Sequence, residues 1–165
     1  MSERHGSTMV RLVPMSDAEF REAFERAVVR HATDFVRRGF WTEEEGTEAS
    51  RAELNHFLPQ GRESPNHYFV KVVDESNGKQ VGEAWYMARP EGGKVRFWVD
   101  WLWTDPQQRR RGIATATLRQ LSQEAAKLGA DRIGLYVFMD NPDAVALYTK
   151  LGFTTMVMGM TLPVK

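Results

Sequence analysis

The part of the sequence that most constrains the fold is a strand–helix–strand unit between Lys94 and Val137. Residues 94–104 are rich in aromatic and β-branched side chains, which is typical of strands. Residues 133–137 alternate between apolar and other side chains and predict a second strand. Between them, apolar residues recur at intervals of four and three and predict one helical face, formed by Ala114, Leu118, Leu121, Ala125 and Leu128. Such a unit predicts two parallel strands joined by a right-handed crossover.

Local signals predict the other elements. Strands are expected at 9–13, 68–74, 79–88 and 153–162, with an Asn-Gly hairpin turn before the third of these. Helices are expected from Ser16, from Thr42 and from Asn141, because the first two start with capping boxes and the third has a cap followed by proline. The elements together predict an α/β sheet with helices on both faces.

Composition limits the classes of function. At 165 residues, 42% of them apolar, the chain is expected to form one domain over 9–165 after a flexible tail at 1–8. The 22 basic and 22 acidic side chains cancel, which argues against a nucleic-acid partner. There is no cysteine, and the four histidines are scattered, so we expect no metal. No apolar run approaches the ~20 residues that span a bilayer, so we expect no membrane partner and a cytoplasmic protein.

The segment from Thr104 to Ala116, T-D-P-Q-Q-R-R-R-G-I-A-T-A, carries the first chemical signal. It is predicted to turn from a strand end into a helix N-terminus, which presents unpaired N–H groups and about half a positive charge. Gly112 lets an anion approach the backbone closely, and Arg109–Arg111 add positive charge. Neither a dinucleotide-binding nor a P-loop glycine pattern is present. From spacing alone, a solvated basic turn remains the alternative.

Two motifs resemble those of one family. The run Arg109–Ala114, R-R-R-G-I-A, resembles the [QR]-x-x-G-x-[GA] signature of the GNAT superfamily of N-acetyltransferases. Asn141–Phe153, N-P-D-A-V-A-L-Y-T-K-L-G-F, resembles its N-x-x-A-x-x-L-Y-x-K-x-G-F pattern at every specified position. The stretches Y-V-F-M-D-N and L-P-Q-G look like a bacterial subgroup with mostly unassigned substrates. The resemblance implies a mixed, mostly antiparallel sheet of six to seven strands with a central parallel strand pair.

The resemblance also implies acetyl-CoA as co-substrate. Its pyrophosphate would lie on the arginine–glycine turn, and its pantetheine arm would pair with the strand before that turn. Tyr148 would face the sulfur and act as general acid. The residues implied to bind the coenzyme are Leu102, Trp103, Thr104, Arg109, Arg110, Arg111, Gly112, Ile113, Ala114 and Asn141. By spacing alone, Tyr148 is better explained as a packed aromatic side chain on an apolar helix face, and the resemblance reverses that preference.

The chemistry requires an amine to lose a proton and attack a thioester carbonyl, whose oxygen needs a donor such as the N–H near Leu102. Asp100 is the expected general base, because burial among aromatic neighbours would raise its pKa. Glu83 and water are the alternatives, and Tyr136 stands where some relatives carry an acid. Asp100 could also be an ordinary strand acid at a bulge.

The predicted function is transfer of an acetyl group to the amine of a small molecule or peptide, with a homodimer as one option. Some of the tryptophans could line the acceptor pocket, which would favour an apolar or aromatic amine. A non-catalytic acyl-CoA sensor is the second reading. A nucleic-acid module built on Arg109–Arg111 is the third, and the balanced charge disfavours it.

Overall fold

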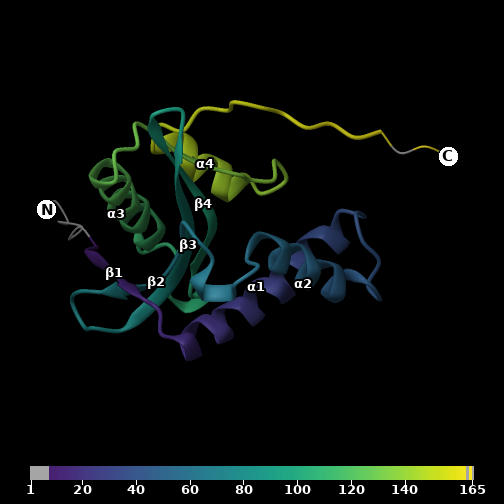
Figure 1. Ribbon diagram of the computed structural model, residues 1–165, viewed down its shortest axis with the longest axis horizontal. Coiled ribbons are helices and arrows are strands. Elements are labelled where there is room, and N and C mark those ends of the chain that lie inside the picture. The colour runs from purple at the N-terminus through teal and green to yellow at the C-terminus, as the bar shows by residue number, and fades with distance from the viewer. Residues whose placement is uncertain (1–7, 163, 165) are drawn as a thin grey trace, which may run out of the picture. The chain divides into compact units, whose positions relative to one another are not determined.

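The computed structural model describes residues 8–162 and residue 164, which fall into one unit up to Leu135 and a second from Tyr136 (Figure 1). All of the tail predicted at 1–8 except Thr8 lies outside the described residues. The second unit contains α4 (Pro142–Lys150). The first unit contains β1 (Val10–Pro14), α1 (Asp17–Arg37), α2 (Gly46–Phe57), β2 (His67–Asp74), β3 (Gln80–Glu91), β4 (Lys94–Thr104), α3 (Ile113–Lys127) and β5 (Ile133–Leu135).

The sheet is mixed, with strand order β1-β2-β3-β4-β5. Neighbouring strands are antiparallel except β4 and β5, which pair in parallel from Phe97↔Ile133 to Val99↔Leu135. The predicted parallel pair is therefore confirmed. It lies at one edge of this sheet instead of its centre, because β5 has β4 as its one strand neighbour among the described residues.

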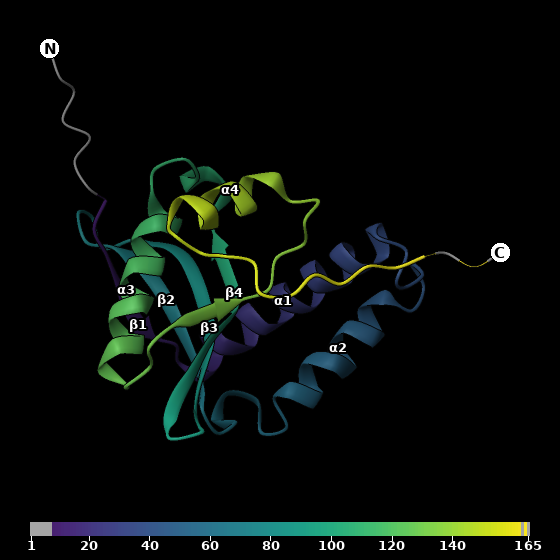
Figure 2. The ribbon, with the colours of Figure 1, turned by 90° about the horizontal axis from the view of Figure 1, so that it is seen from above.

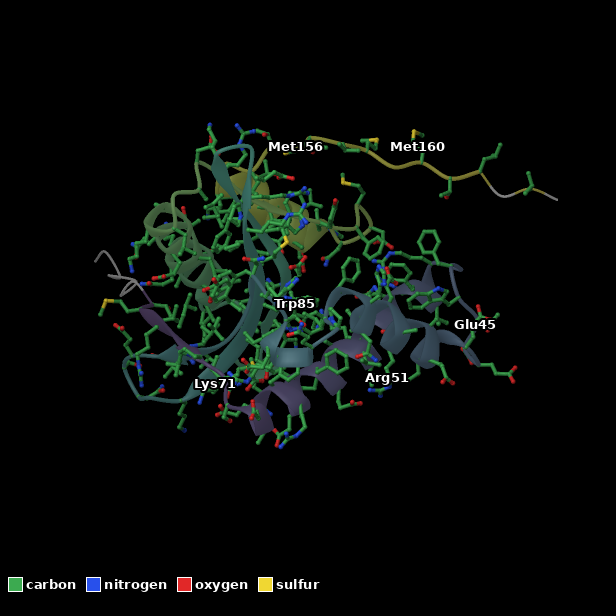
Figure 3. All side chains as sticks on the ribbon, viewed as in Figure 1. Glu45, Arg51, Lys71, Trp85, Met156 and Met160 are labelled. Atoms are coloured by element: carbon green, nitrogen blue, oxygen red, sulfur yellow. The ribbon has the colours of Figure 1, made fainter. Side chains whose placement is uncertain are left out.

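The prediction of six to seven strands is wrong for the described part of the chain, where the sheet has five. The expected last strand at 153–162 forms none. Met156 and Met160, which alternate along this segment and are labelled in Figure 3, are 69% and 88% exposed. Neither burial nor backbone pairing therefore stabilises a strand here, and alternation alone does not supply a partner.

Helix α1 covers one face of the sheet. Its predicted capping box is confirmed: the Ser16 hydroxyl accepts from the Glu19 N–H at 3.4 Å, and the Glu19 carboxylate accepts from the Ser16 N–H at 2.8 Å. Trp85 of β3 lies between the sheet and α1 (Figure 3). The apolar cluster around it comprises Met15, Phe20, Ala23, Ala27, Val28, Leu54 and Leu58. Helix α2 packs on α1 and begins at Gly46, where a Cβ would lie 2.6 Å from Val36.

Helix α3 covers the opposite face, as Figure 2 shows, which confirms helices on both faces. Ile113 packs there with Val10, Val72 and Val81. The helix ends at Lys127, and Gly129 two residues later has a φ of +87°, the left-handed conformation predicted for the C-terminal cap.

Strand β4 contains a bulge at Asp100. Val99 pairs with Tyr86 and Trp101 pairs with Trp85, so Asp100 has no partner on β3. Val99 points toward the α3 face, where Tyr86 stacks on Phe97. Alternation then directs Asp100 to the α1 face, and the bulge brings Trp101 to that face as well, against the Trp85 cluster. Asp100 and Trp101, which strict alternation would place on opposite faces, therefore lie on the same face of β4.

Candidate functional site

The turn between β4 and α3 leads into a helix whose N-terminus no side chain caps. The Asp105 N–H bonds the Val81 carbonyl at 3.0 Å, and its carboxylate accepts from the Gln107 N–H at 2.9 Å. Gly112 is the N-cap residue of α3 with φ +77°, and no side chain caps this helix. The first N–H groups of α3, from Ile113 onward, therefore have no intrahelical acceptor and present the positive end of the helix dipole.

The three arginines of the turn differ in their contacts. Arg109 Nε donates to the Thr104 carbonyl at 3.4 Å. Arg111 donates to the Gln108 side chain and lies 3.5 Å from the Asp74 carboxylate. Arg110 is exposed, has φ +60°, and makes no hydrogen bond or ion pair within residues 8–162. Two arginines thus brace the turn, and the third is available to an anion.

Asp74 and Thr8 hold the turn in place. Asp74 is 2% exposed and accepts from the Ser76 hydroxyl at 2.6 Å and the Ser76 N–H at 2.9 Å. These bonds, with the nearby Arg111 charge, hold the pKa of the Asp74 carboxyl below its usual value. The Thr8 hydroxyl donates to the Arg111 carbonyl at 2.5 Å. Sequence reasoning missed both residues; the Asp-x-Ser spacing was the one available signal, and it indicates only a local turn.

Beyond β5, strand β4 presents an open backbone edge. Because the Asp105 N–H bonds Val81, the pairs Thr104↔Gly82 and Leu102↔Ala84 are of the kind that exchange no hydrogen bonds. The N–H and C=O groups of Leu102 and Thr104 therefore point away from β3. Strand β5 stops opposite Val99, so no strand of the described chain pairs with them. The backbone of Trp103, by contrast, bonds to β3.

The two candidate bases share the α1 face but differ in surroundings. Burial raises the pKa of the Asp100 carboxyl to about 7, although the residue keeps solvent contact and the Arg96 charge opposes the rise. Glu83 is 1% exposed, and its Oε1 accepts from Arg26 and, at 3.3 Å, from Gln80. The other oxygen of Glu83 is buried without a hydrogen-bond partner in the described part of the chain.

The second unit carries the other predicted site residues. Asn141 caps α4 as predicted, since its side-chain oxygen accepts from the Ala144 N–H at 3.3 Å and Pro142 follows it. Tyr148 is half-buried, with its ring 5.6 Å from that of Phe153, and burial raises the pKa of its phenol. That Asn141 lies near the coenzyme and that Tyr148 faces its sulfur stay predictions.

Two wider features bear on the kind of site. Within the described residues, no three His, Asp or Glu side chains are grouped so that they could hold a metal ion. No helix in the described ranges combines the length and the apolar composition that a bilayer crossing requires.

Comparison with known proteins identifies the family. Residues 26–153 match the model of the acetyltransferase (GNAT) family. The chain is 32% identical to YdgE, an uncharacterized N-acetyltransferase of Bacillus subtilis, over 86% of this chain and 90% of that one. It is 30% identical to a second such protein of B. subtilis, YycN, over 93% and 99% of the two chains. The crystal structure of YycN matches it with a TM-score of 0.88 at 27% identity, covering 95% and 99%.

The chain therefore belongs to the GNAT family and is an N-acetyltransferase. The names of these two B. subtilis relatives specify no acceptor. A shorter match, to the spermine/spermidine N(1)-acetyltransferase of B. subtilis, is 33% identical over 53% of this chain and 60% of that protein.

Proposed function

We propose that this enzyme transfers the acetyl group of acetyl-CoA to a primary amine by direct attack, with Tyr148 as general acid. One observation carries the proposal. The open backbone edge at Leu102 and Thr104 is followed directly by the turn at 105–112, which leads to the uncapped N-terminus of α3. An extended amide chain that ends in a pyrophosphate has the shape and charge to occupy both.

The chain's own groups fit this co-substrate. The N–H groups at the start of α3 and the Arg110 guanidinium would hold the pyrophosphate, while Gly112 lets it approach the backbone. The N–H and C=O groups of Leu102 and the N–H of Thr104 would pair with the amides of the pantetheine arm as a neighbouring strand does, while the Thr104 carbonyl already accepts from Arg109. Each such bond contributes about 0.5–1.5 kcal/mol net.

The transfer forms an N–C bond and breaks a C–S bond. The Leu102 N–H, on the open edge, would donate to the carbonyl oxygen as negative charge develops there. Tyr148 is well suited to protonate the departing sulfur, because a phenol with a raised pKa stays protonated at neutral pH. Positioning of the amine against the thioester supplies the larger part of the rate.

Asp100 is the better-supported general base. It lies on the bulge, two residues before Leu102, and a pKa near 7 suits a group that must gain and lose a proton. Glu83 has the disadvantage that the guanidinium of Arg26 already occupies one of its oxygens. Water remains the alternative if Asp100 proves dispensable.

Replacement of Tyr148 by phenylalanine tests the acid role. We expect kcat, measured as free thiol released from acetyl-CoA with an amine panel, to fall about 10²-fold or more. The Kd for acetyl-CoA should stay within about twofold. Tyr68→Phe, at a 41% exposed tyrosine of β2, is the matched control. A Tyr148→Phe enzyme with the wild-type rate would contradict the acid role. Tight acetyl-CoA binding without thiol release from any amine would favour the non-catalytic sensor instead.

A further inference from the structure

Near Trp101, on the sheet face that α1 covers, lie two opposite charges without ion-pair partners among the described residues. The Arg30 guanidinium of α1 lies 5.9 Å from the centre of the Trp101 ring. Within residues 8–162, Arg30 has no carboxylate partner, and no hydrogen bond or ion pair holds the Asp100 carboxylate. Both residues are exposed, so a solute can reach them.

The other charges on this face are already matched. Arg26 pairs with Glu83, and Arg96 lies 3.6 Å from Glu91 while its guanidinium stacks over a tryptophan of β4. What remains is one positive group and one negative group. This is the complement of a molecule that carries an ammonium and a carboxylate.

Trp101 supplies a further donor beside Arg30. Its indole N–H is buried and has no acceptor in the described part of the chain. A buried donor without an acceptor is unfavourable, so an oxygen arriving from a ligand would relieve it. Arg30 lies over the ring by a weak, solvent-exposed contact, so it can turn toward an incoming carboxylate. Its planar guanidinium binds carboxylates through two parallel hydrogen bonds.

We propose that the acceptor is a free α-amino acid with an apolar or aromatic side chain, an inference that rests on the function proposed above. Arg30 and the Trp101 indole hold its carboxylate, and Asp100 faces its amine beside the Leu102 edge. The ammonium and carboxylate of an α-amino acid are separated by one carbon, and Asp100 and Trp101 are consecutive residues. The short spacing of the two protein groups thus matches the ligand. The half-buried indoles of Trp98 and Trp101 on this face of β4 offer the apolar surface for the side chain.

The same charges disfavour a polyamine. Arg26 is paired with Glu83 and Glu22, and Arg96 with Glu91, so among the described residues the unpaired Arg30 guanidinium stands here beside the one unpaired carboxylate, that of Asp100. A polycation would meet one carboxylate with a guanidinium beside it, whereas a zwitterion would match both groups. The partial match to a spermine/spermidine acetyltransferase therefore need not extend to the acceptor.

The test compares four acceptors with the full-length enzyme and acetyl-CoA: phenylalanine, phenylalanine amide, phenethylamine and spermidine. Thiol release gives kcat/KM, and mass spectrometry identifies the product. Phenylalanine should exceed both its amide and phenethylamine by about tenfold or more. Arg30→Gln should reduce the phenylalanine-to-phenethylamine ratio by about tenfold, and Arg30→Lys should restore part of it. Arg21→Gln, at another exposed arginine of α1, is the matched control and should leave the ratio unchanged.

The outcomes separate this inference from the proposed function. A ratio unaffected by Arg30→Gln, or a preference for spermidine or phenethylamine over phenylalanine, overturns the amino-acid acceptor and leaves acetyl transfer standing. Calorimetric binding of acetyl-CoA without acetylation of any of the four compounds also overturns it. Failure to bind acetyl-CoA overturns the proposed function itself, and this inference with it. Unfolding of each variant, followed by circular dichroism, verifies that every comparison is made between folded proteins.

Discussion

Replacing Gly112 by alanine separates the helix cap from the anion site. Gly112 and Gly129 stand at the two ends of α3 with φ of +77° and +87°. A Cβ at Gly112 would meet nothing nearer than the Thr8 hydroxyl at 3.9 Å, and a Cβ at Gly129 would meet nothing within 4 Å. Both changes therefore act through the backbone, at about 1–2 kcal/mol for an L side chain in the left-handed region. For a chain of this size each should lower Tm by about 2–8 °C.

Acetyl-CoA binding should distinguish the two variants. At Gly112 the new methyl group would occupy the place where, in the proposed complex, a phosphate approaches the N–H groups of α3, whereas Gly129 lies beyond the opposite end of the helix. Loss of one charge-assisted hydrogen bond, at about 1.5–3 kcal/mol, corresponds to a Kd increase of about tenfold to a hundredfold. We expect this increase for Gly112→Ala, and less than a twofold change for Gly129→Ala.

Calorimetric titration with acetyl-CoA, paired with thermal unfolding, measures both quantities on the same samples. The reasoning is refuted if Gly112→Ala binds acetyl-CoA as the wild type does. It is refuted equally if Gly129→Ala weakens binding as much, since the effect would then follow stability alone.

Four further predictions concern Asp100, Arg110 and Gly134. Because a base works only when ionised and the Asp100 pKa is raised to about 7, kcat should rise as pH passes through about 7, and Asp100→Asn should remove that inflection in a pH profile. Because the pKa of Asp100 is higher in the folded state than in the unfolded state, the folded state binds this proton more tightly. The contribution of Asp100 to the free energy of unfolding should therefore fall as the pH rises from about 4 to about 7, which urea titrations at a series of pH values can measure. Arg110→Gln should raise the Kd for acetyl-CoA about tenfold, whereas Arg119→Gln on exposed α3 surface should not, by calorimetry. Gly134→Ala should destabilise the fold by about 1–3 kcal/mol in urea unfolding, because its Cβ would lie 2.1 Å from the Trp98 ring.

Elements with local signals could be predicted from the sequence. The Ser16 capping box, the Asn141 cap with its proline and the glycine that ends α3 are each determined by a few adjacent residues. The parallel crossover from β4 to β5 followed in the same way, because it depends on the order of elements and on chirality.

Features that depend on distant partners could not be predicted. The alternation at 153–162 suggested a strand, but a strand forms only where another strand or a core receives it. The different roles of the three arginines depend on Asp74, Gln108 and the Thr104 carbonyl, and only the folded turn brings these groups together. The sequence allows a bulge at Asp100, but only the register with β3 shows that it is there and that Trp101 therefore lies on the α1 face.

A crystal structure of the enzyme with coenzyme A tests the central claim most directly. The account predicts the pyrophosphate within hydrogen-bond distance of the N–H groups at Gly112–Ala114. It also predicts pantetheine amides paired with Leu102 and Thr104, and the Tyr148 hydroxyl within about 4 Å of the sulfur. A coenzyme bound elsewhere, with the β4 edge left empty, would contradict it.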